Sequence, residues 1–336
     1  MRVMVTGATG FIGSHAVEAL LAAGHQVRLL ARTPAKAAAR FGPQGVADVD
    51  IVAGDMTDRA AVRAAVEGCD ALLHSAAVVG VARGDLSATS SNLIGTKVVL
   101  KAGLEAGCDP ILYTSSMATL YPPHEPMLTV DSPLGDPLSQ YGRSKVEAER
   151  HVRALQAEGA PIVSFLIGGV FGPDQPQLDS AMAGIVAALS QTMVVPRGGV
   201  GVLDVRDLGA LFVAALEPGR GPRRYMAGGR FLSWQDWTDL LAEVTGNPIR
   251  RLRLPASVIH LSGRAIDLAK RIRWFDYPLT YEAALFMTEA VPTDDRPTMT
   301  ELGVERRPTA ETLADSTRWL IEAGHLRPEH APLLRV

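Results

Sequence analysis

Short apolar runs alternate with longer amphipathic stretches through the first half of the chain. The runs are short enough to be buried strands, whereas the stretches between them repeat apolar residues every three or four positions. The apolar runs predict strands at residues 3–5, 26–31, 49–53, 71–74, 111–114 and 162–167. The amphipathic stretches predict helices at residues 11–23, 58–67, 91–106 and 141–158.

Strands that alternate with helices predict an α/β fold with a doubly wound parallel sheet. Parallel neighbours cannot be joined by a tight turn, so each connection needs a right-handed crossover, which the predicted helices provide. Ligands of such sheets bind beyond the carboxyl ends of the strands. The candidate site residues named below follow such strand ends or lie on the next helix.

The pattern changes after Gly172-Pro173, where turn-forming residues become dense. Short helices are expected there at residues 207–216, 233–244 and 309–322, together with a short strand at residues 224–227. We therefore expect a larger sheet domain at residues 1–172 and a smaller lobe, partly interleaved with it, at residues 173–336.

Composition and charge exclude several classes of protein. The net charge of −3 gives no reason to expect nucleic acid or an anionic membrane as a partner. No apolar run reaches the roughly 18 residues of a transmembrane helix. Cys69 and Cys108 are too few for a disulfide framework or a zinc site, so we predict no metal and interpret both as small apolar side chains in a reduced compartment. The chain is expected to be soluble and cytoplasmic.

The first predicted strand leads into a glycine-rich turn that opens the first helix. Gly7 permits the tight turn, Gly10 lets the backbone approach a pyrophosphate, and Gly13 lets helix and strand pack closely. The helix N-terminus adds amide donors and the positive end of its dipole. The pattern predicts a dinucleotide-binding Rossmann domain at residues 1–172, with residues 173–336 as the substrate-binding lobe. The other residues of this turn expected at the cofactor are Thr9, Phe11 and Ile12.

The residue after the second predicted strand favours NADP(H) over NAD(H). NAD-binding proteins usually place an acid there for the ribose 2′-hydroxyl, whereas this chain has Arg32. A guanidinium can donate a charge-assisted fork to a 2′-phosphate, and Lys36 supplies a second cation. A charged hydrogen bond worth about 1.5–3 kcal/mol would favour NADPH by roughly one to two orders of magnitude. The alternative is that Arg32 is a solvated surface side chain.

The next two strand ends are also expected to contact the cofactor. Asp55 can accept a hydrogen bond from an adenine amino group, although it could instead cap the following helix, for which Asp58 is better placed. Small residues after the fourth strand let the cofactor lie against the backbone, while His74 is interpreted as a packed core histidine. The residues predicted at these two strand ends are Asp55, Met56, Ser75, Ala76 and Ala77.

Tyr141 and Lys145 form a candidate acid/base pair. They lie four positions apart on a predicted helix and therefore share a face. A phenol with a pKa near 10 is a poor acid/base at neutral pH, but a nearby ammonium and the positive ring of an oxidised nicotinamide are expected to lower that pKa. Lys145 can also hold the ribose hydroxyls, and Ser116 can hydrogen-bond the substrate oxygen. The alternative is an incidental pair on a helix surface.

Taken together, these motifs resemble the extended short-chain dehydrogenase/reductases, the NAD-dependent epimerase/dehydratase superfamily, over nearly the full length. The motifs that carry the resemblance are T-G-A-T-G-F-I-G at 6–13, G-D-M at 54–56, H-S-A-A at 74–77, N-L-I-G-T at 92–96, Y-T-S-S at 113–116, Y-G-R-S-K at 141–145 and D-V-R-D-L at 204–208. The resemblance implies a catalytic triad of Ser116, Tyr141 and Lys145. It also implies a homodimer formed through the helices at 91–106 and 141–158. Further cofactor contacts implied by the resemblance are at Asn92, Thr114 and Val170.

Two departures point away from the sugar-nucleotide branch of this superfamily. Leu166-Ile167 stands where epimerases and dehydratases usually carry Arg-Pro, and Ser115-Ser116-Met117 lacks the Asp-Glu pair of the dehydratases. The pattern looks closest to dihydroflavonol reductase and 3β-hydroxysteroid dehydrogenase-like members. This resemblance implies an NADP(H)-dependent reductase or dehydrogenase that acts on the carbonyl or alcohol of an apolar small molecule. The alternatives are a nucleotide-sugar epimerase with tightly held NAD and a non-catalytic nucleotide-binding sensor, which would usually lack Tyr or Lys.

The substrate pocket is expected to form from segments 78–90 and 117–139 and the lobe after Pro173. Their apolar side chains favour an apolar substrate, although such loops can simply pack on the lobe. The side chains concerned are Val78, Val79, Val81, Met117, Leu120 and Tyr121. Segment 257–275 predicts an amphipathic helix with a basic face, either a core or lid helix or a membrane-surface patch that collects lipophilic substrate.

Overall fold

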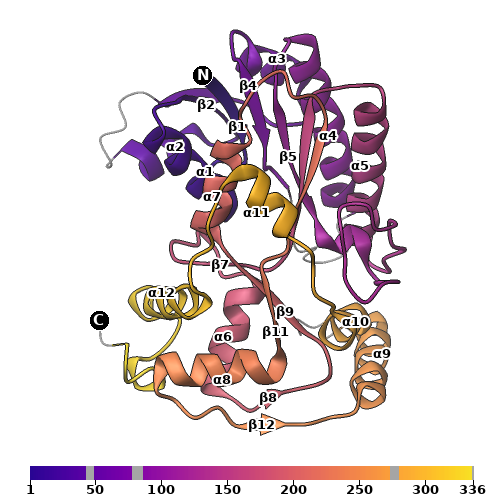
Figure 1. The fold of residues 1–336 in the computed structure, drawn as a ribbon, viewed down its shortest axis with the longest axis vertical. Helices are drawn as coiled ribbons and strands as arrows, with labels where there is room; N and C mark the ends of the chain where they lie inside the picture. Colours follow the sequence, from indigo (N-terminus) through magenta and orange to yellow (C-terminus); the bar gives the residue numbers. More distant parts are fainter. Residues whose placement is uncertain (43–48, 78–85, 273–279, 335–336) are drawn as a thin grey trace.

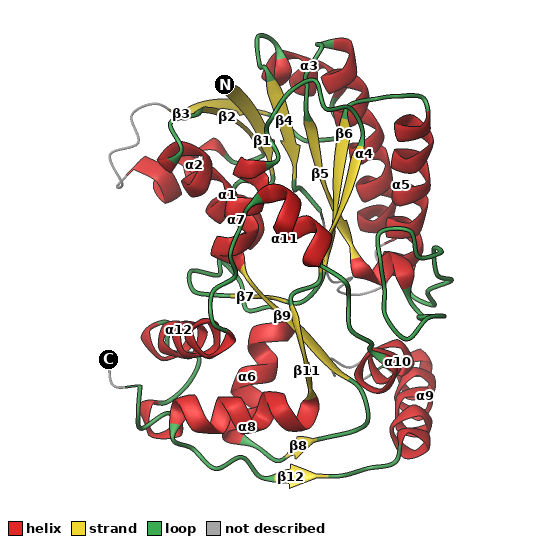
Figure 2. Ribbon diagram, viewed as in Figure 1, coloured by secondary structure: helices red, strands yellow, loops and turns green. Residues whose placement is uncertain are grey.

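A seven-stranded parallel sheet organises the computed structural model, which describes residues 1–42, 49–77, 86–272 and 280–334 (Figures 1 and 2). The strand order is β10–β6–β5–β4–β1–β2–β3, and every neighbouring pair runs parallel. The strands are β1 (Arg2–Thr6), β2 (Gln26–Ala31), β3 (Val49–Ala53), β4 (Ala71–His74), β5 (Ile111–Ser116), β6 (Ile162–Ile167) and β10 (Arg223–Ala227). The predicted doubly wound α/β fold is confirmed. The order reverses between β1 and β4, which is where such sheets bind ligands.

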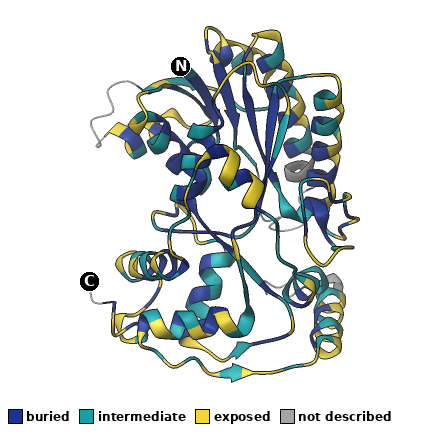
Figure 3. Cartoon of the chain, in the orientation of Figure 1, coloured by how far each residue is buried: buried dark blue, intermediate teal, exposed yellow. Residues whose placement is uncertain are grey.

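Helices cover both faces of this sheet. One core cluster joins the sheet to α1 (Phe11–Ala22), α2 (Pro34–Phe41) and α7 (Val205–Ala214). A second cluster joins the opposite face to α3 (Arg59–Val66), α4 (Leu86–Glu105) and α5 (Gln140–Ala157). The central strands are buried on both sides, as the colouring of Figure 3 shows, which explains why they read as continuous apolar runs in the sequence.

Several helices and strands begin or end where a capping residue, a glycine or a strand partner sets the boundary. Helix α1 stops before Gly24, whose φ of +80° suits a glycine, and Asp58 caps α3 by accepting from the amides of Ala60 and Ala61. Strand β5 runs two residues further than predicted, to Ser116 rather than Thr114, because Ser115 and Ser116 pair with Leu166 and Ile167 of β6. Helix α2 was not predicted, because it is only eight residues long and its apolar positions are mostly alanine.

The rest of the chain builds a second lobe below the sheet (Figure 1). Its core packs α6 (Ser180–Ser190), α8 (Trp234–Thr245) and α12 (Thr309–Glu322) around Trp237. A three-stranded sheet of β7 (Val170–Phe171), β9 (Gly199–Asp204) and β11 (Arg230–Ser233) links this core to the larger layer. The remaining elements are β8 (Met193–Val194), β12 (Arg251–Leu252), α9 (Ala256–Ile272), α10 (Tyr281–Glu289) and α11 (Arg296–Leu302). The chain also returns upward: α7 packs on α1, and β10 extends the main sheet beside β6.

Helix α9 occupies the outer edge of this lobe and packs against α10 (Figure 1). Ile259 is buried, whereas Leu261 and Leu268 are 69% and 60% exposed. The helix is therefore not part of the core, and the lid and membrane-surface interpretations are the two that it still fits. No helix in the described ranges is long and apolar enough to cross a membrane.

Candidate active site

The glycine turn between β1 and α1 has the geometry that a closely approaching ligand requires. Gly7 adopts a φ of +76°, and a Cβ there would lie 2.6 Å from the amide nitrogen of Ala76. A Cβ on Gly13 would lie 2.1 Å from the carbonyl oxygen of Gly7, so that glycine lets α1 sit against the turn. Gly10 differs from both, because it is exposed and a Cβ there would find its nearest neighbour, the Gly7 oxygen, at 3.2 Å.

The start of α1 offers backbone donors without a competing side chain. Gly10 is the N-cap and provides no side-chain hydrogen bond, whereas Asp58, Ser139 and Asp204 cap α3, α5 and α7. The first turn of α1 also carries no acidic residue, which would compete with an anion. The turn fits a dinucleotide pyrophosphate for these reasons. Thr9, Phe11 and Ile12 are half-buried in or beside it, and Phe11 packs edge-on against His15.

The ends of β2 and β3 lie side by side and bring Arg32 to Asp55. The Arg32 side chain is 76% exposed, and its Nε lies 4.0 Å from Asp55 Oδ2. The other carboxylate oxygen of Asp55 accepts from the amide and hydroxyl of Thr57. Burial alone would raise the pKa of Asp55, but these hydrogen bonds and Arg32 outweigh it and the pKa is lowered. Lys36 is exposed on the first turn of α2.

The residues after β4 pack directly on the glycine turn. Ser75 donates its hydroxyl to the carbonyl oxygen of Thr6 at 2.8 Å, and the amide of Ala76 lies 3.3 Å from the Thr6 hydroxyl. Ala76 and its neighbour Ala77 are half-buried. His74, 1% exposed, is hydrogen-bonded to the hydroxyls of Thr6 and Thr96, so the predicted core histidine is confirmed. Burial and the nearby Lys145 lower its pKa to about 3, which keeps the ring neutral.

Helix α4 covers this region from the other side of the sheet. Asn92 is buried on it, one turn before Thr96. Met56 lies against the backbone of Gly95, because a Cβ placed on Gly95 would come within 2.6 Å of Met56 Cγ. Met56, after β3, and Asn92 are thus brought to the same part of the molecule.

Ser116 and Tyr141 meet between the end of β5 and the start of α5. The Ser116 hydroxyl lies close enough to the Tyr141 phenol to lower the pKa of that phenol. Ser116 also accepts from the amide of Ala118, which caps the short 3₁₀ turn Met117–Leu120. Ser139 caps α5 by accepting from the amide of Gly142, and this cap fixes the turn that carries Tyr141.

The pKa of Tyr141 shifts in the direction opposite to the sequence prediction. Burial raises it above its usual value of 10, and the hydrogen bond with Ser116 opposes that rise. The prediction counted the attraction of an ammonium and a nicotinamide ring, whereas the loss of water around the buried phenol has the larger effect in this structure. The phenol therefore carries its proton at neutral pH in this structure.

Lys145 lies one helical turn after Tyr141 and is buried. Its Nζ donates to the carbonyl oxygen of Thr114 at 3.5 Å and lies 6.0 Å from the centre of the Tyr113 ring. Burial lowers the pKa of Lys145 to about 8, although the charge of Glu149 acts in the opposite direction. Thr114 also donates its hydroxyl to the carbonyl oxygen of His74, so it joins β5 to β4 beneath the site.

Val170 lies beside the segment that follows Ser116. It is buried in β7, paired with Leu203, and two glycines precede it. A Cβ on the first of them, Gly168, would lie 2.6 Å from the Gly228 oxygen and 3.0 Å from Met117 Sδ. The Val170 segment is therefore held close to the Ser116 end of β5.

The residues predicted to line the substrate pocket could instead pack on the lobe, and the described ones divide between these two alternatives. Leu120 and Tyr121 are buried in a core cluster, where the Tyr121 ring packs 4.3 Å from that of Phe286. These two side chains pack on the lobe and do not line an open pocket, whereas Met117 is half-buried next to Ser116. The predicted lining residues Val78, Val79 and Val81 lie outside the described residues.

Sequence reasoning missed Glu149, which is 0% exposed on α5. It accepts a hydrogen bond from Ser115 at 2.7 Å and forms an ion pair with Arg153 at 3.0 Å. A signal was available, because Glu149 follows Lys145 at the same four-residue spacing that joins Lys145 to Tyr141.

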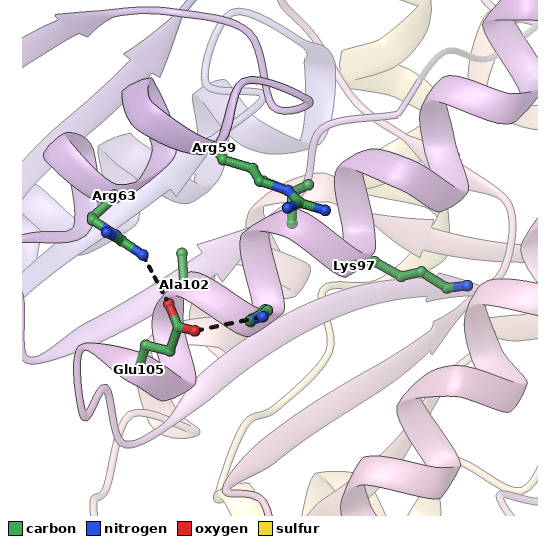
Figure 4. Close-up of a pocket in the computed structure, with 7 residues that line it drawn as sticks. Arg59, Arg63, Lys97, Ala102 and Glu105 are labelled. Atoms are coloured by element: carbon green, nitrogen blue, oxygen red, sulfur yellow. Dashed lines mark hydrogen bonds and ion pairs between the residues drawn. The ribbon is translucent and has the colours of Figure 1, made fainter.

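Two cavities in the described part of the chain lie away from these residues. One, of about 170 Å³, lies between α3 and α4, where Glu105 pairs with Arg63 and Lys101 at 3.5 and 3.7 Å (Figure 4). The other, of about 390 Å³, lies beside β9 and the start of α12. Neither is lined by a predicted site residue. The described residues also hold no group of acids, histidines or cysteines that could bind a metal ion.

Comparison with known proteins identifies the family. The model of the NAD dependent epimerase/dehydratase family matches residues 3–228, two-thirds of the chain. The chain belongs to this family. Its enzymes of the extended short-chain dehydrogenase/reductase type use NAD or NADP, and this chain is such an enzyme.

Relatives of this chain carry different names. Sterol demethylase protein B of Methylococcus capsulatus is 28% identical over 334 residues, 96% of this chain and 99% of that protein. A putative dihydroflavonol 4-reductase of Synechocystis is 27% identical over 97% of this chain and 96% of that protein. UDP-glucose 4-epimerase of Neisseria meningitidis is 31% identical over 51% of this chain and 53% of that protein.

Solved structures show the same fold over nearly the whole chain. The crystal structure of gox2253 superposes with a TM-score of 0.82 at 24% identity, covering 97% of this chain and 99% of that chain. UDP-glucose-4-epimerase of Stenotrophomonas maltophila, solved with bound NAD, gives a TM-score of 0.75 at 21% identity, with 97% and 99% covered.

Proposed function

We propose that this protein is an NADP(H)-dependent oxidoreductase that interconverts a carbonyl and a secondary alcohol on an apolar small molecule. The observation that carries the proposal is the approach of the Ser116 hydroxyl to the phenol of Tyr141, with Lys145 buried one turn further along the same helix. A nucleotide-binding sensor would need none of the three side chains in this arrangement.

Each of the three side chains has a distinct task. The Ser116 hydroxyl holds and polarises the substrate oxygen, and Tyr141 transfers the proton to or from it. Burial raises the pKa of Tyr141, so the phenol is protonated at neutral pH, which is the form that carbonyl reduction consumes. The Lys145 ammonium stabilises the phenolate that remains and holds the ribose. Bound NADP(H) would supply or accept the hydride at its nicotinamide ring.

The preference for NADP(H) rests on Arg32 and Lys36. Arg32 stands at the end of β2 with most of its side chain exposed, and Lys36 is exposed on the next helix. Asp55 lies at the edge of ion-pair distance from Arg32 and is already engaged by Thr57. The guanidinium therefore has donors left for a 2′-phosphate.

The remaining cofactor contacts belong to the same proposal. The turn residues Gly7, Gly10 and Gly13 face the pyrophosphate, and Asp55 faces the adenine. The side chains or backbone groups proposed to complete the cofactor site are Thr9, Phe11, Ile12, Met56, Ser75, Ala76, Ala77, Asn92, Thr114 and Val170.

An apolar substrate is supported by the surroundings of Ser116. Met117 follows it directly and packs beside Gly168 and Gly228, next to a cluster that contains Leu120 and Leu166. Leu166 and Ile167 fill the positions where sugar-nucleotide enzymes usually carry Arg-Pro, and both are buried. Of these side chains, the half-buried Met117 offers apolar surface beside Ser116.

Epimerisation of a nucleotide sugar is the second candidate, because the same three side chains perform it. The family description and the likeness to UDP-glucose 4-epimerases support this second candidate. Such an enzyme would hold NAD tightly and show no net turnover of cofactor.

Assembly and location complete the proposal. A homodimer formed through α4 and α5 is supported by Ile94, which is 49% exposed on α4, beside α5. A reducing compartment such as the cytoplasm is supported by Cys69 and Cys108, both free and buried.

The experiment that tests the proposal supplies the purified protein with NADPH and a panel of apolar ketones and aldehydes. Loss of NADPH with formation of the alcohol supports it. Conversion of UDP-glucose without added cofactor, with NAD that co-purifies with the protein, would replace it with the epimerase.

A further inference from the structure

Glu149 is a buried acid with no task in the chemistry proposed above. It is 0% exposed, and it lies on α5 four residues after Lys145 and eight residues after Tyr141. Acids are rarely buried to this degree unless they are paired, because removing a carboxylate from water is costly. Its neighbours therefore indicate what it does.

Two side chains hold Glu149, and they come from different elements. Ser115, near the end of β5, donates its hydroxyl to Oε2 at 2.7 Å, and Arg153 of α5 donates its Nε to Oε1 at 3.0 Å. Ser115 is itself 4% exposed. The carboxylate thus connects the end of β5, which carries Ser116, to α5, which carries Tyr141.

The same carboxylate acts on the ammonium of Lys145. Burial removes water from Lys145 and lowers its pKa to about 8, and Glu149 is the charge that opposes this loss. The groups that face the ammonium from other elements do not replace that charge. His74 on β4 is neutral, Tyr113 on β5 presents its ring, and Thr114 offers a carbonyl oxygen.

We propose that Glu149 is a positioning residue of this active site, which fixes β5 against α5 through Ser115 and keeps Lys145 charged. The inference rests on the proposed function for its meaning, since a charged Lys145 matters only if Tyr141 transfers a proton. Arg153 moderates the effect, because its guanidinium shares the charge of Glu149. No part of this role requires Glu149 to touch substrate or cofactor.

The test reads Lys145 directly and needs no substrate. The chain contains five lysines, so carbon-13 labelling of lysine gives few signals, and the one absent from Lys145→Met belongs to Lys145. Its titration midpoint is followed by NMR in the wild type and in Glu149→Gln, which keeps the shape and loses the charge. We expect the midpoint to fall by about one unit or more in Glu149→Gln, because loss of a nearby opposite charge typically shifts a pKa by about 1–3 units.

Three further variants separate charge from shape. Glu149→Asp keeps the charge and is expected to titrate near the wild-type midpoint. Ser115→Ala removes the hydrogen bond and keeps the charge, so it too is expected to titrate near that midpoint. Arg153→Gln frees the full charge of Glu149, and its midpoint is expected to rise; this variant keeps the proposal testable if Glu149→Gln does not fold.

The outcomes distinguish this inference from the proposed function. A Glu149→Gln midpoint equal to that of the wild type, or an Arg153→Gln midpoint that does not rise, overturns the inference whatever the enzyme does. Full turnover in Tyr141→Phe would instead overturn the proposed function and leave the titration result standing.

Discussion

The hydroxyl of Ser116 and the phenol of Tyr141 approach each other across the junction of β5 and α5. The two residues are far apart in sequence, and each is fixed by its own local device. Ser116 caps the 3₁₀ turn that follows β5, while the Ser139 cap sets the first turn of α5. The pair is therefore held ready before any ligand arrives, which is the arrangement that acid/base catalysis requires.

Replacing Gly13 by alanine is expected to lower stability, whereas replacing Gly10 by alanine is expected to weaken cofactor binding. A Cβ on Gly13 would overlap the Gly7 oxygen at 2.1 Å, so Gly13→Ala is expected to lose about 1–3 kcal/mol of unfolding free energy. Gly10→Ala meets nothing nearer than 3.2 Å and is expected to lose less than about 1 kcal/mol. The methyl group of the alanine in Gly10→Ala would instead enter the pyrophosphate position and weaken cofactor binding about tenfold or more. Urea denaturation and nucleotide fluorescence titration measure the two effects; equal stability losses would contradict this account.

Arg32 is expected to set the choice between NADPH and NADH. Arg32→Ala should weaken NADPH binding by about one to two orders of magnitude and leave NADH binding nearly unchanged, because only NADPH carries the 2′-phosphate. Arg59→Ala serves as the control, since Arg59 lies at the separate cavity beside α3. Comparable dissociation constants for both nucleotides in the wild type, unchanged in Arg32→Ala, would refute the assignment.

His74 is expected to make the protein acid-sensitive. Its pKa is about 3 in the folded chain and 6.5 when unfolded, so the unfolded chain binds the proton more readily between these values. Stability should therefore fall as pH decreases below 6.5, by about 2 kcal/mol at pH 5. His74→Gln can keep contacts to Thr6 and Thr96 without gaining a charge, and denaturation at pH 7.5 and pH 5 should show a smaller loss for it. An identical loss in both proteins would remove His74 as the cause.

Helix α9 is expected to bind anionic lipid surfaces weakly. Leu261 and Leu268 are exposed on it, and the surrounding segment 250–270 carries five cationic residues and one acid. Leu261→Ser/Leu268→Ser should reduce co-sedimentation with phosphatidylserine vesicles without loss of stability. Leu333→Ser is the matched control, because Leu333 is 68% exposed elsewhere. Absence of binding at low salt would identify α9 as a lid helix.

The sequence predicted the sheet domain closely because its signals are local. Strands β2, β3, β4 and β6 begin and end at the predicted residues, since each is a mostly apolar run bounded by turn residues. The candidate site residues were proposed by the same logic, because strand ends of a parallel sheet meet at one edge.

What the sequence did not predict depends on contacts between distant segments. The raised pKa of Tyr141 and the lowered pKa of Lys145 come from burial, which no local motif specifies. The link from Ser115 to Glu149 joins a strand to a helix and becomes visible only when β5 and α5 pack. Leu120 and Tyr121 were candidates for the pocket and turned inward, because α10 supplies Phe286 to cover them.

The central claim is that Tyr141 transfers the proton, and the turnover rate of Tyr141→Phe tests it most directly. The measurement follows NADPH-dependent reduction of an apolar ketone, with NADPH binding determined in the same preparation. We predict a rate lower by about 10²–10⁴-fold, with the dissociation constant of NADPH within a few-fold of the wild type. A variant that retains more than about a tenth of the wild-type rate would contradict general acid catalysis by this residue.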